Sequence, residues 1–88
     1  MGLPENPVTL TPAEIDELNR KLSTMRHNIN NYLSLVVAAT ELMRYKPEMI
    51  EKMTVTLGDQ PNRIIEEVRR FSKEFETSLG ITREPPKV

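Results

Sequence analysis

Apolar residues recur along the first half of this chain at alternating steps of three and four, the spacing that marks one face of an α-helix. The series comprises Ile15, Leu18, Leu22, Met25, Ile29, Tyr32, Val36, Ala39 and Met43. Thr11 stands just before the series as a capping residue, followed by Pro12 at a position that needs no amide donor and by Glu14 three residues after the cap. We therefore predict one long helix over about residues 12–45.

A second apolar series begins after Pro47, a residue that disfavours helical angles just before it and can itself open a new helix. The series comprises Ile50, Met53, Leu57, Ile64, Val68, Phe71, Phe75 and Leu79. It predicts a helix over about residues 47–79 that ends before Gly80. Pro61 removes one backbone donor, so we expect a kink or a short break near 58–61. The apolar register resumes in phase afterwards, which favours the kink.

These patterns divide the chain into three parts. Residues 1–10 form an extended arm, residues 11–80 form a helical hairpin, and residues 81–88 form a C-terminal tail that contains two prolines. Two long helices joined by a tight connection near 45–47 must lie antiparallel, and each presents one apolar stripe. Because two helices cannot enclose a core, we predict an all-α fold in which the hairpin dimerises into a four-helix bundle.

Charged residues on the predicted outer faces follow the acid-first order with a spacing of four, which favours ion pairs on a helix. Three such pairs are expected. They are Asp16 with Arg20, Glu17 with Lys21, and Glu66 with Arg70.

Composition excludes several functional classes. The 88-residue chain has no cysteine and one histidine, which removes disulfides, thiolate nucleophiles and the usual zinc ligand sets. The net charge of -1, from 12 basic and 13 acidic residues, argues against a nucleic-acid partner. The longest apolar run, residues 33–39, is far shorter than the roughly 20 residues of a membrane span. We therefore expect a cytoplasmic protein with no membrane partner and no cofactor of its own.

The single histidine, His27, lies in the middle of the first predicted helix, and Asn31 follows it by four residues. Residues four apart share a helix face, so an imidazole and a carboxamide can act on the same small group. If Ile15 takes the a position of a heptad, both residues fall outside the apolar seam and should be exposed. A plain surface role is the alternative. Three asparagines at 28, 30 and 31 are costly for helix propensity, however, which favours a functional reason.

Residues 22–43 resemble the phosphoacceptor segment, or H-box, of the dimerisation and histidine-phosphotransfer domain of bacterial sensor histidine kinases. The matching positions are Arg26, His27, Asn31, Leu33, Leu35, Val36, Glu41 and Leu42. A more generic similarity covers residues 12–80. The resemblance implies a homodimeric four-helix bundle whose exposed histidine exchanges a phosphoryl group with an aspartate of a response-regulator receiver domain. The Mg²⁺ used in that exchange is expected on the receiver.

The resemblance also implies roles for individual residues. His27 is the phosphoacceptor, Asn31 orients a water or the phosphate, and Arg26 is an electrostatic auxiliary. Arg26 has an alternative role as a residue that flanks the seam at position e. The chain departs from the family at Asn28, where an acid usually accepts the imidazole proton. It also contains no glycine-rich nucleotide loop and is too short for an ATP-binding domain, so we expect no autonomous kinase activity.

Three functions remain open at this point. The first is a phosphotransfer module that exchanges a phosphoryl group with a receiver aspartate or assists its dephosphorylation. The second is a non-catalytic dimeric adaptor that binds a receiver domain or another helical partner, with no catalytic role for His27. The third is an unrelated coiled-coil assembly protein, which a species other than a dimer would favour.

Overall fold

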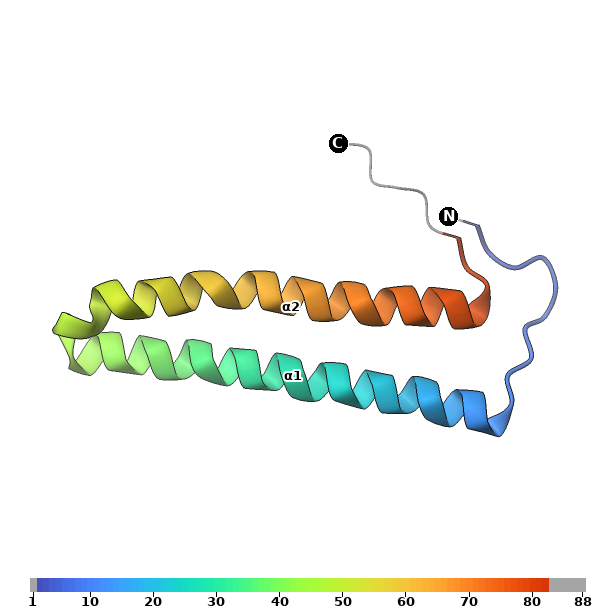
Figure 1. Ribbon diagram of the computed structural model, residues 1–88, viewed down its shortest axis with the longest axis horizontal. Helices are drawn as coiled ribbons and strands as arrows, with labels where there is room; N and C mark the ends of the chain where they lie inside the picture. The colour runs from blue at the N-terminus through green and yellow to red at the C-terminus, as the bar shows by residue number, and fades with distance from the viewer. Residues whose placement is uncertain (1, 83–88) are drawn as a thin grey trace.

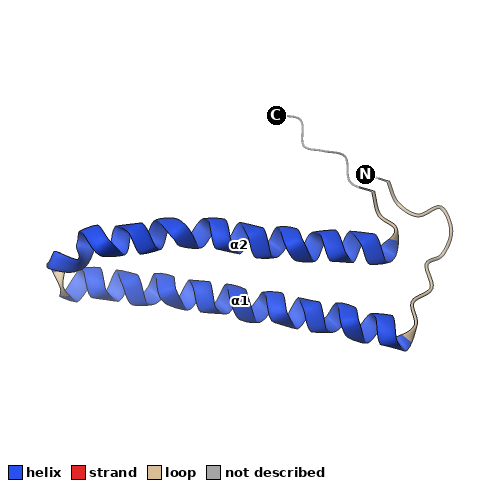
Figure 2. Ribbon diagram, in the orientation of Figure 1, coloured by secondary structure: helices blue, strands red, loops and turns tan. Residues whose placement is uncertain are grey.

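Two long helices run antiparallel and side by side in the computed structural model, which describes residues 2–82 (Figure 1). Helix α1 spans Pro12–Tyr45, the 3-10 turn η1 spans Pro47–Met49, and helix α2 spans Ile50–Leu79. Apart from these helical elements and Lys46 at the turn, the described residues form loops at the open end of the hairpin (Figure 2). The expected all-α helical hairpin is therefore confirmed for the single chain.

The residues that start and end helix α1 lie within a few positions of its termini. The Thr11 side chain accepts a hydrogen bond from the Glu14 amide at 3.1 Å, and the Glu14 carboxylate accepts one from the Thr11 amide at 3.1 Å. This capping box satisfies two amide groups that the first turn leaves without helical partners. At the other end, the Lys46 amide donates to the Leu42 carbonyl at 2.8 Å, directly before Pro47. The helix bounds agree with the expected 12–45.

The connection between the helices differs from the prediction in its first turn. We expected the second helix to start at about residue 47, but Pro47 opens a 3-10 turn and the α-helix begins at Ile50. The Met49 amide donates to the Lys46 carbonyl at 2.8 Å, across three residues rather than four. A 3-10 turn is tighter than an α-turn, which suits the abrupt reversal of the chain.

Helix α2 continues through Pro61 without a break, so the short break considered near 58–61 does not occur. It ends at Gly80, which has a φ of 67° in the left-handed region. The amide of Ile81 donates back to the Glu76 carbonyl at 2.8 Å and closes the last turn. Glycine suits this position because an L side chain is strained at positive φ.

The extended arm is tied to the segment after α2. Gly2 and Thr82 form an isolated antiparallel bridge, in which the distances from amide nitrogen to carbonyl oxygen are 2.6 and 2.7 Å. Both described ends of the chain therefore meet at the end of the hairpin opposite the turn (Figure 1). Residues 83–88 of the expected tail lie outside the described residues.

Two of the three buried residues of the described chain are polar. Ala39 is the buried hydrophobic residue of the described chain, whereas the other two buried residues are Gln60 and Glu67. Nearby, the Lys21 ammonium on α1 binds the Glu74 carboxylate on α2 at 2.7 Å. Gln60, Glu67 and Glu74 are spaced by seven residues, so they form one row along α2 that faces α1.

Two of the three expected ion pairs are wrong, and both fail in the same way. They are Asp16 with Arg20 and Glu66 with Arg70. Each arginine instead binds the acid three residues earlier, Glu17 at 2.6 Å and Glu67 at 3.0 Å, because residues three apart are also neighbours on a helix. The hydrogen bonds from Arg20 lower the pKa of Glu17 below its ordinary value. The remaining expected pair, Glu17 with Lys21, has an N to O distance of 4.0 Å.

Candidate functional site

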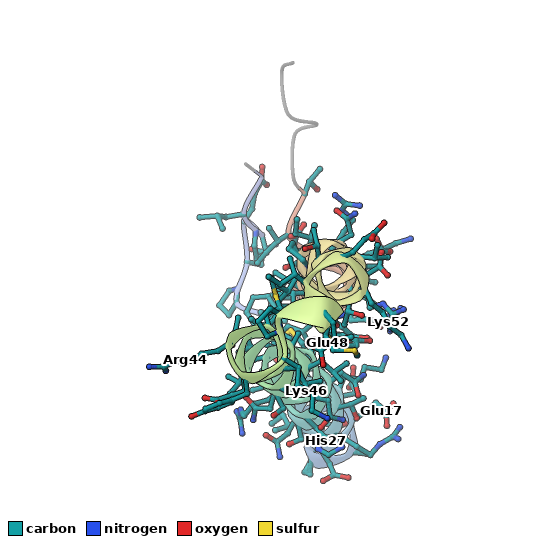
Figure 3. The ribbon with its side chains drawn as sticks, turned by 90° about the vertical axis from the view of Figure 1, so that its left-hand side faces the viewer. Glu17, His27, Arg44, Lys46, Glu48 and Lys52 are labelled. Carbon is teal, nitrogen blue, oxygen red and sulfur yellow. The ribbon has the colours of Figure 1, made fainter. Side chains whose placement is uncertain are left out.

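His27 and Asn31 lie together near the middle of α1 and both are exposed, as their heptad positions predicted. Figure 3 shows His27 on the side of α1 that is turned away from α2. The Asn31 amide nitrogen lies 3.3 Å from Nε2 of His27, within hydrogen-bond distance. The sequence spacing thus correctly anticipated that the two side chains meet.

The direction of this hydrogen bond depends on which nitrogen of His27 carries the ring proton. An amide nitrogen can only donate a hydrogen bond, so Nε2 of the neutral imidazole accepts it in the tautomer that carries its proton on Nδ1. In that tautomer the single lone pair of Nε2 points toward the Asn31 amide nitrogen. A neutral, exposed imidazole is a competent nucleophile near neutral pH once this hydrogen bond opens.

The residues that flank His27 in sequence point elsewhere. Successive residues are about 100° apart on a helix, so Arg26 and Asn28 lie on opposite sides of the His27 face. Arg26 is exposed and shares its side of α1 with Leu22 and Leu33, whereas Asn28 is half-buried. The structure brings His27 and Asn31 together and leaves Arg26 on a different side of the helix.

A groove between the helices lies on the polar side of the hairpin, near the candidate site. Its volume is about 260 Å³, and Met25 and Phe71 are the apolar residues that line it. Its charged rim consists of Arg20, Lys21, Glu67, Arg70 and Glu74. Every one of these rim residues is already ion-paired, either within its own helix or across the groove.

Sequence reasoning missed this groove and the polar row beneath it. The apolar series of the second helix includes Leu57 and Ile64, which are half-buried, and Val68, which is exposed, whereas the buried residues of α2 are Gln60 and Glu67. The seven-residue spacing of Gln60, Glu67 and Glu74 was a usable signal, because it repeats at the period of a helix seam. Residues in the seam between two helices are usually apolar. A search for apolar periodicity therefore did not detect this row of polar residues.

Two negative findings concern the described part of the chain. Within residues 2–82, no group of three His, Asp or Glu side chains is placed to hold a metal ion. In the same residues, no helix is both long enough and apolar enough to span a membrane.

No protein-family model, curated protein or solved structure matches this chain significantly. The candidate site therefore consists of His27 and Asn31 within the segment from Arg26 to Leu42. These are local features of α1, and they can be tested directly by substitution.

Proposed function

We propose that this protein is a phosphotransfer module of two-component signalling, in which His27 exchanges a phosphoryl group with an aspartate of a response-regulator receiver domain. One observation carries the proposal: His27 is exposed on the outer side of α1 with Nε2 held 3.3 Å from the Asn31 amide. An exposed imidazole can meet a partner's phosphoaspartate in line, which a buried one cannot.

The proposed step forms one bond and breaks one bond. The hydrogen bond between Asn31 and Nε2 opens, the Nε2 lone pair of His27 attacks the phosphorus of the receiver's phosphoaspartate, and an N–P bond forms as the acyl O–P bond breaks. The aspartate leaves as a carboxylate, and the Nδ1 proton can pass to solvent. Mg²⁺ bound by the receiver would balance the charge of the transferred group. Once Nε2 is occupied, the Asn31 amide is placed to donate to a phosphoryl oxygen.

Asn31 also supports the related reaction in which water removes the phosphoryl group from the receiver. A carboxamide can hold a water by hydrogen bonding without acting as a base. Asn28 stands where a proton-accepting acid would assist phosphorylation by ATP, so the receiver is the better phosphoryl donor for His27. Arg26, although on another side of the helix, adds positive charge near an incoming phosphate. The absence of cysteine fits the cytoplasm, where receiver domains act.

Transfer can be tested by mixing the purified protein with a panel of receiver domains phosphorylated by acetyl phosphate. We expect acid-labile phosphate on the protein, detected by intact mass, and no such phosphate on His27→Gln. Circular dichroism of the variant should match the wild type, because His27 is exposed and glutamine is a good helix former. Phosphate that persists in His27→Gln would overturn the proposal.

A matched pair of asparagine variants tests the second residue. Asn31→Ala should slow loss of phosphate from the receiver or from His27 by about tenfold or more, the size of effect that follows from removing one oriented hydrogen bond. Asn30→Ala is the control, because Asn30 is also exposed but lies about 100° away around the helix. Equal rates for both variants would show that Asn31 has no special part in the reaction.

A non-catalytic adaptor is the second candidate, and Asn28 is the observation that favours it. An adaptor would bind a receiver or another helical partner without taking its phosphate. In the same mixing experiment it would give a stable complex, no acid-labile phosphate, and equal binding by wild type and His27→Gln.

A further inference from the structure

The groove between α1 and α2 has an arginine on each of its walls. Arg20 lines it from α1 and Arg70 lines it from α2, and their side chains are 68% and 63% exposed. Each arginine is bound by the acid three residues earlier in its own helix, at 2.6 Å for Glu17 and 3.0 Å for Glu67. Both guanidinium groups are therefore oriented by ion pairs within their own helices.

These ion pairs leave part of each guanidinium group available. A guanidinium group has five N–H donors in a planar fork. The Glu17 carboxylate accepts from Nε and Nη2 of Arg20, and within residues 2–82 Nη1 of Arg20 has no acceptor. The Glu67 carboxylate accepts from Nη1 of Arg70, and in the same residues Nε and Nη2 of Arg70 have none. Each arginine can therefore bind a second anion while it keeps the first.

The charge of the groove favours a monovalent anion. Three cations and two carboxylates line it, which gives a net charge of +1, and these residues are Arg20, Lys21, Glu67, Arg70 and Glu74. Glu67 is 8% exposed, and the Glu74 carboxylate is bound to the Lys21 ammonium at 2.7 Å, so both negative charges are already neutralised. A carboxylate matches this net charge, whereas a phosphate monoester has a charge of about −1.5 to −2 near neutral pH.

The apolar lining and the volume of the groove indicate the body of such a ligand. Met25 and Phe71 are the apolar residues that line it, and both are half-buried. An aromatic ring packs favourably against a thioether and against another aromatic ring. The volume of about 260 Å³ lies just below the range of about 300–1,000 Å³ that is typical of drug-sized ligands. A single ring with one charged substituent suits this space.

We propose that the groove binds a small aromatic carboxylate, whose oxygens contact Arg20 and Arg70 while its ring packs on the apolar lining. Arginine suits this role because its planar N–H fork matches the two oxygens of a carboxylate. A ligand bound by one arginine from each helix links α1 to α2, so its binding should stabilise the hairpin. The inference does not rest on the proposed phosphotransfer, because neither His27 nor Asn31 lines the groove.

Three ring compounds of nearly the same shape test the charge preference on the full chain. Benzoate is an anion, benzamide is neutral and benzamidine is a cation. In ¹H–¹⁵N NMR titrations, we expect benzoate to shift the amides of residues 20–25 and 67–74 with a dissociation constant of about 1 mM. Benzamide should bind about tenfold more weakly or less, and benzamidine should leave these amides unshifted. Benzoate at about ten times its dissociation constant should raise Tm by about 5 °C.

Matched arginine variants locate the site on each helix. Arg20→Gln should raise the benzoate dissociation constant about tenfold, because it removes one charged donor. Arg26→Gln should leave the constant unchanged, because six residues place Arg26 about 120° away from Arg20 around α1. On α2 the equivalent pair is Arg70→Gln and its control Arg69→Gln, since adjacent residues lie about 100° apart.

The Arg20 pair decides the question if Arg70→Gln loses helix content in circular dichroism. The ion pair that Arg20→Gln removes is exposed on both sides, so this variant should keep the wild-type fold. Groove amides that stay unshifted at ten times the expected benzoate dissociation constant would overturn the proposal. So would benzamide that binds as tightly as benzoate, or a loss of benzoate binding in Arg26→Gln as large as in Arg20→Gln.

Discussion

Polar side chains in the seam between the helices are bound mainly to their own helix. The Gln60 amide nitrogen donates to the Thr56 carbonyl at 2.8 Å, while its Oε1 is buried without a hydrogen-bond partner in the described structure. Glu67 is 8% exposed, and Arg70, which is 63% exposed, reaches over it at 3.0 Å. The seam therefore depends on a surface arginine to neutralise a mostly buried carboxylate.

Replacing Arg70 should lower the free energy of unfolding more than replacing its neighbour Arg69. We expect Arg70→Ala to lower the free energy of unfolding by about 1–3 kcal/mol, because it leaves the Glu67 carboxylate buried without its ion-pair partner. Arg69→Ala should cost about 0–0.5 kcal/mol, because its partner Glu66 is 59% exposed. Urea denaturation of the two variants measures the difference, and equal losses would contradict this account of the seam.

The contact between His27 and Asn31 could be predicted from the sequence because the two residues are close together in the chain. His27 and Asn31 are four apart on one helix, and the helix period alone brings them together. The groove could not be predicted in the same way, because Lys21 and Glu74 come from segments distant in sequence. Their 2.7 Å contact depends on how α2 is rotated against α1, which no single helix pattern determines.

The two helices differ in their N-terminal capping and in whether their interior contains residues that disfavour a helix. Helix α1 has a capping box at its start and no glycine or internal proline, whereas α2 has no side-chain cap and contains both Gly58 and Pro61. Gly58 would gain a Cβ in open space, with nothing within 4 Å, while Gly80 has positive φ. The same residue type is thus unfavourable at one position and required at the other.

Two glycine substitutions should therefore act in opposite directions. We expect Gly58→Ala to raise the free energy of unfolding by about 0.5–1 kcal/mol, since alanine loses less backbone entropy in a helix. Gly80→Ala should lower it by about 1 kcal/mol, because an L residue is strained in the left-handed conformation. Thermal melts at matched concentration provide the comparison. A loss of stability in Gly58→Ala would mean that the helix is not regular there.

The ends of a helix could be predicted where the residues that define them are adjacent in the sequence. Thr11 and Glu14 define the start of α1, and Lys46 before Pro47 defines its end. The start of α2 was misjudged by three residues because proline is compatible with both a 3-10 turn and an α-turn. The arginine partners were misjudged because spacings of three and four both bring side chains together.

The whole molecule is long and thin. Its Cα atoms extend 59 Å along the longest axis and 12 Å along the shortest, so the hairpin is one layer of helices with no interior of its own. Stable domains are normally built from at least two packed layers. In the four-helix bundle predicted from the sequence, a second hairpin would supply the second layer.

Thermal stability should therefore depend on protein concentration. If folding and pairing are coupled, each tenfold rise in concentration should raise Tm by about 4 °C, given the unfolding entropy typical of a chain pair of this size. Differential scanning calorimetry over a range from low to high micromolar measures the shift. A Tm that does not change with concentration would show that the hairpin is stable as a monomer.

The bridge between Gly2 and Thr82 also decides how the molecule would respond to mechanical force. Both described ends of the chain meet at the open end of the hairpin, so a pull applied between them loads the cross-helix contacts one after another. The 2.6 and 2.7 Å hydrogen bonds would break first, then the Lys21 to Glu74 ion pair, and the opening would travel toward η1. The hairpin should therefore unzip progressively at low force, whereas the same helices pulled from opposite ends would shear all their contacts at once.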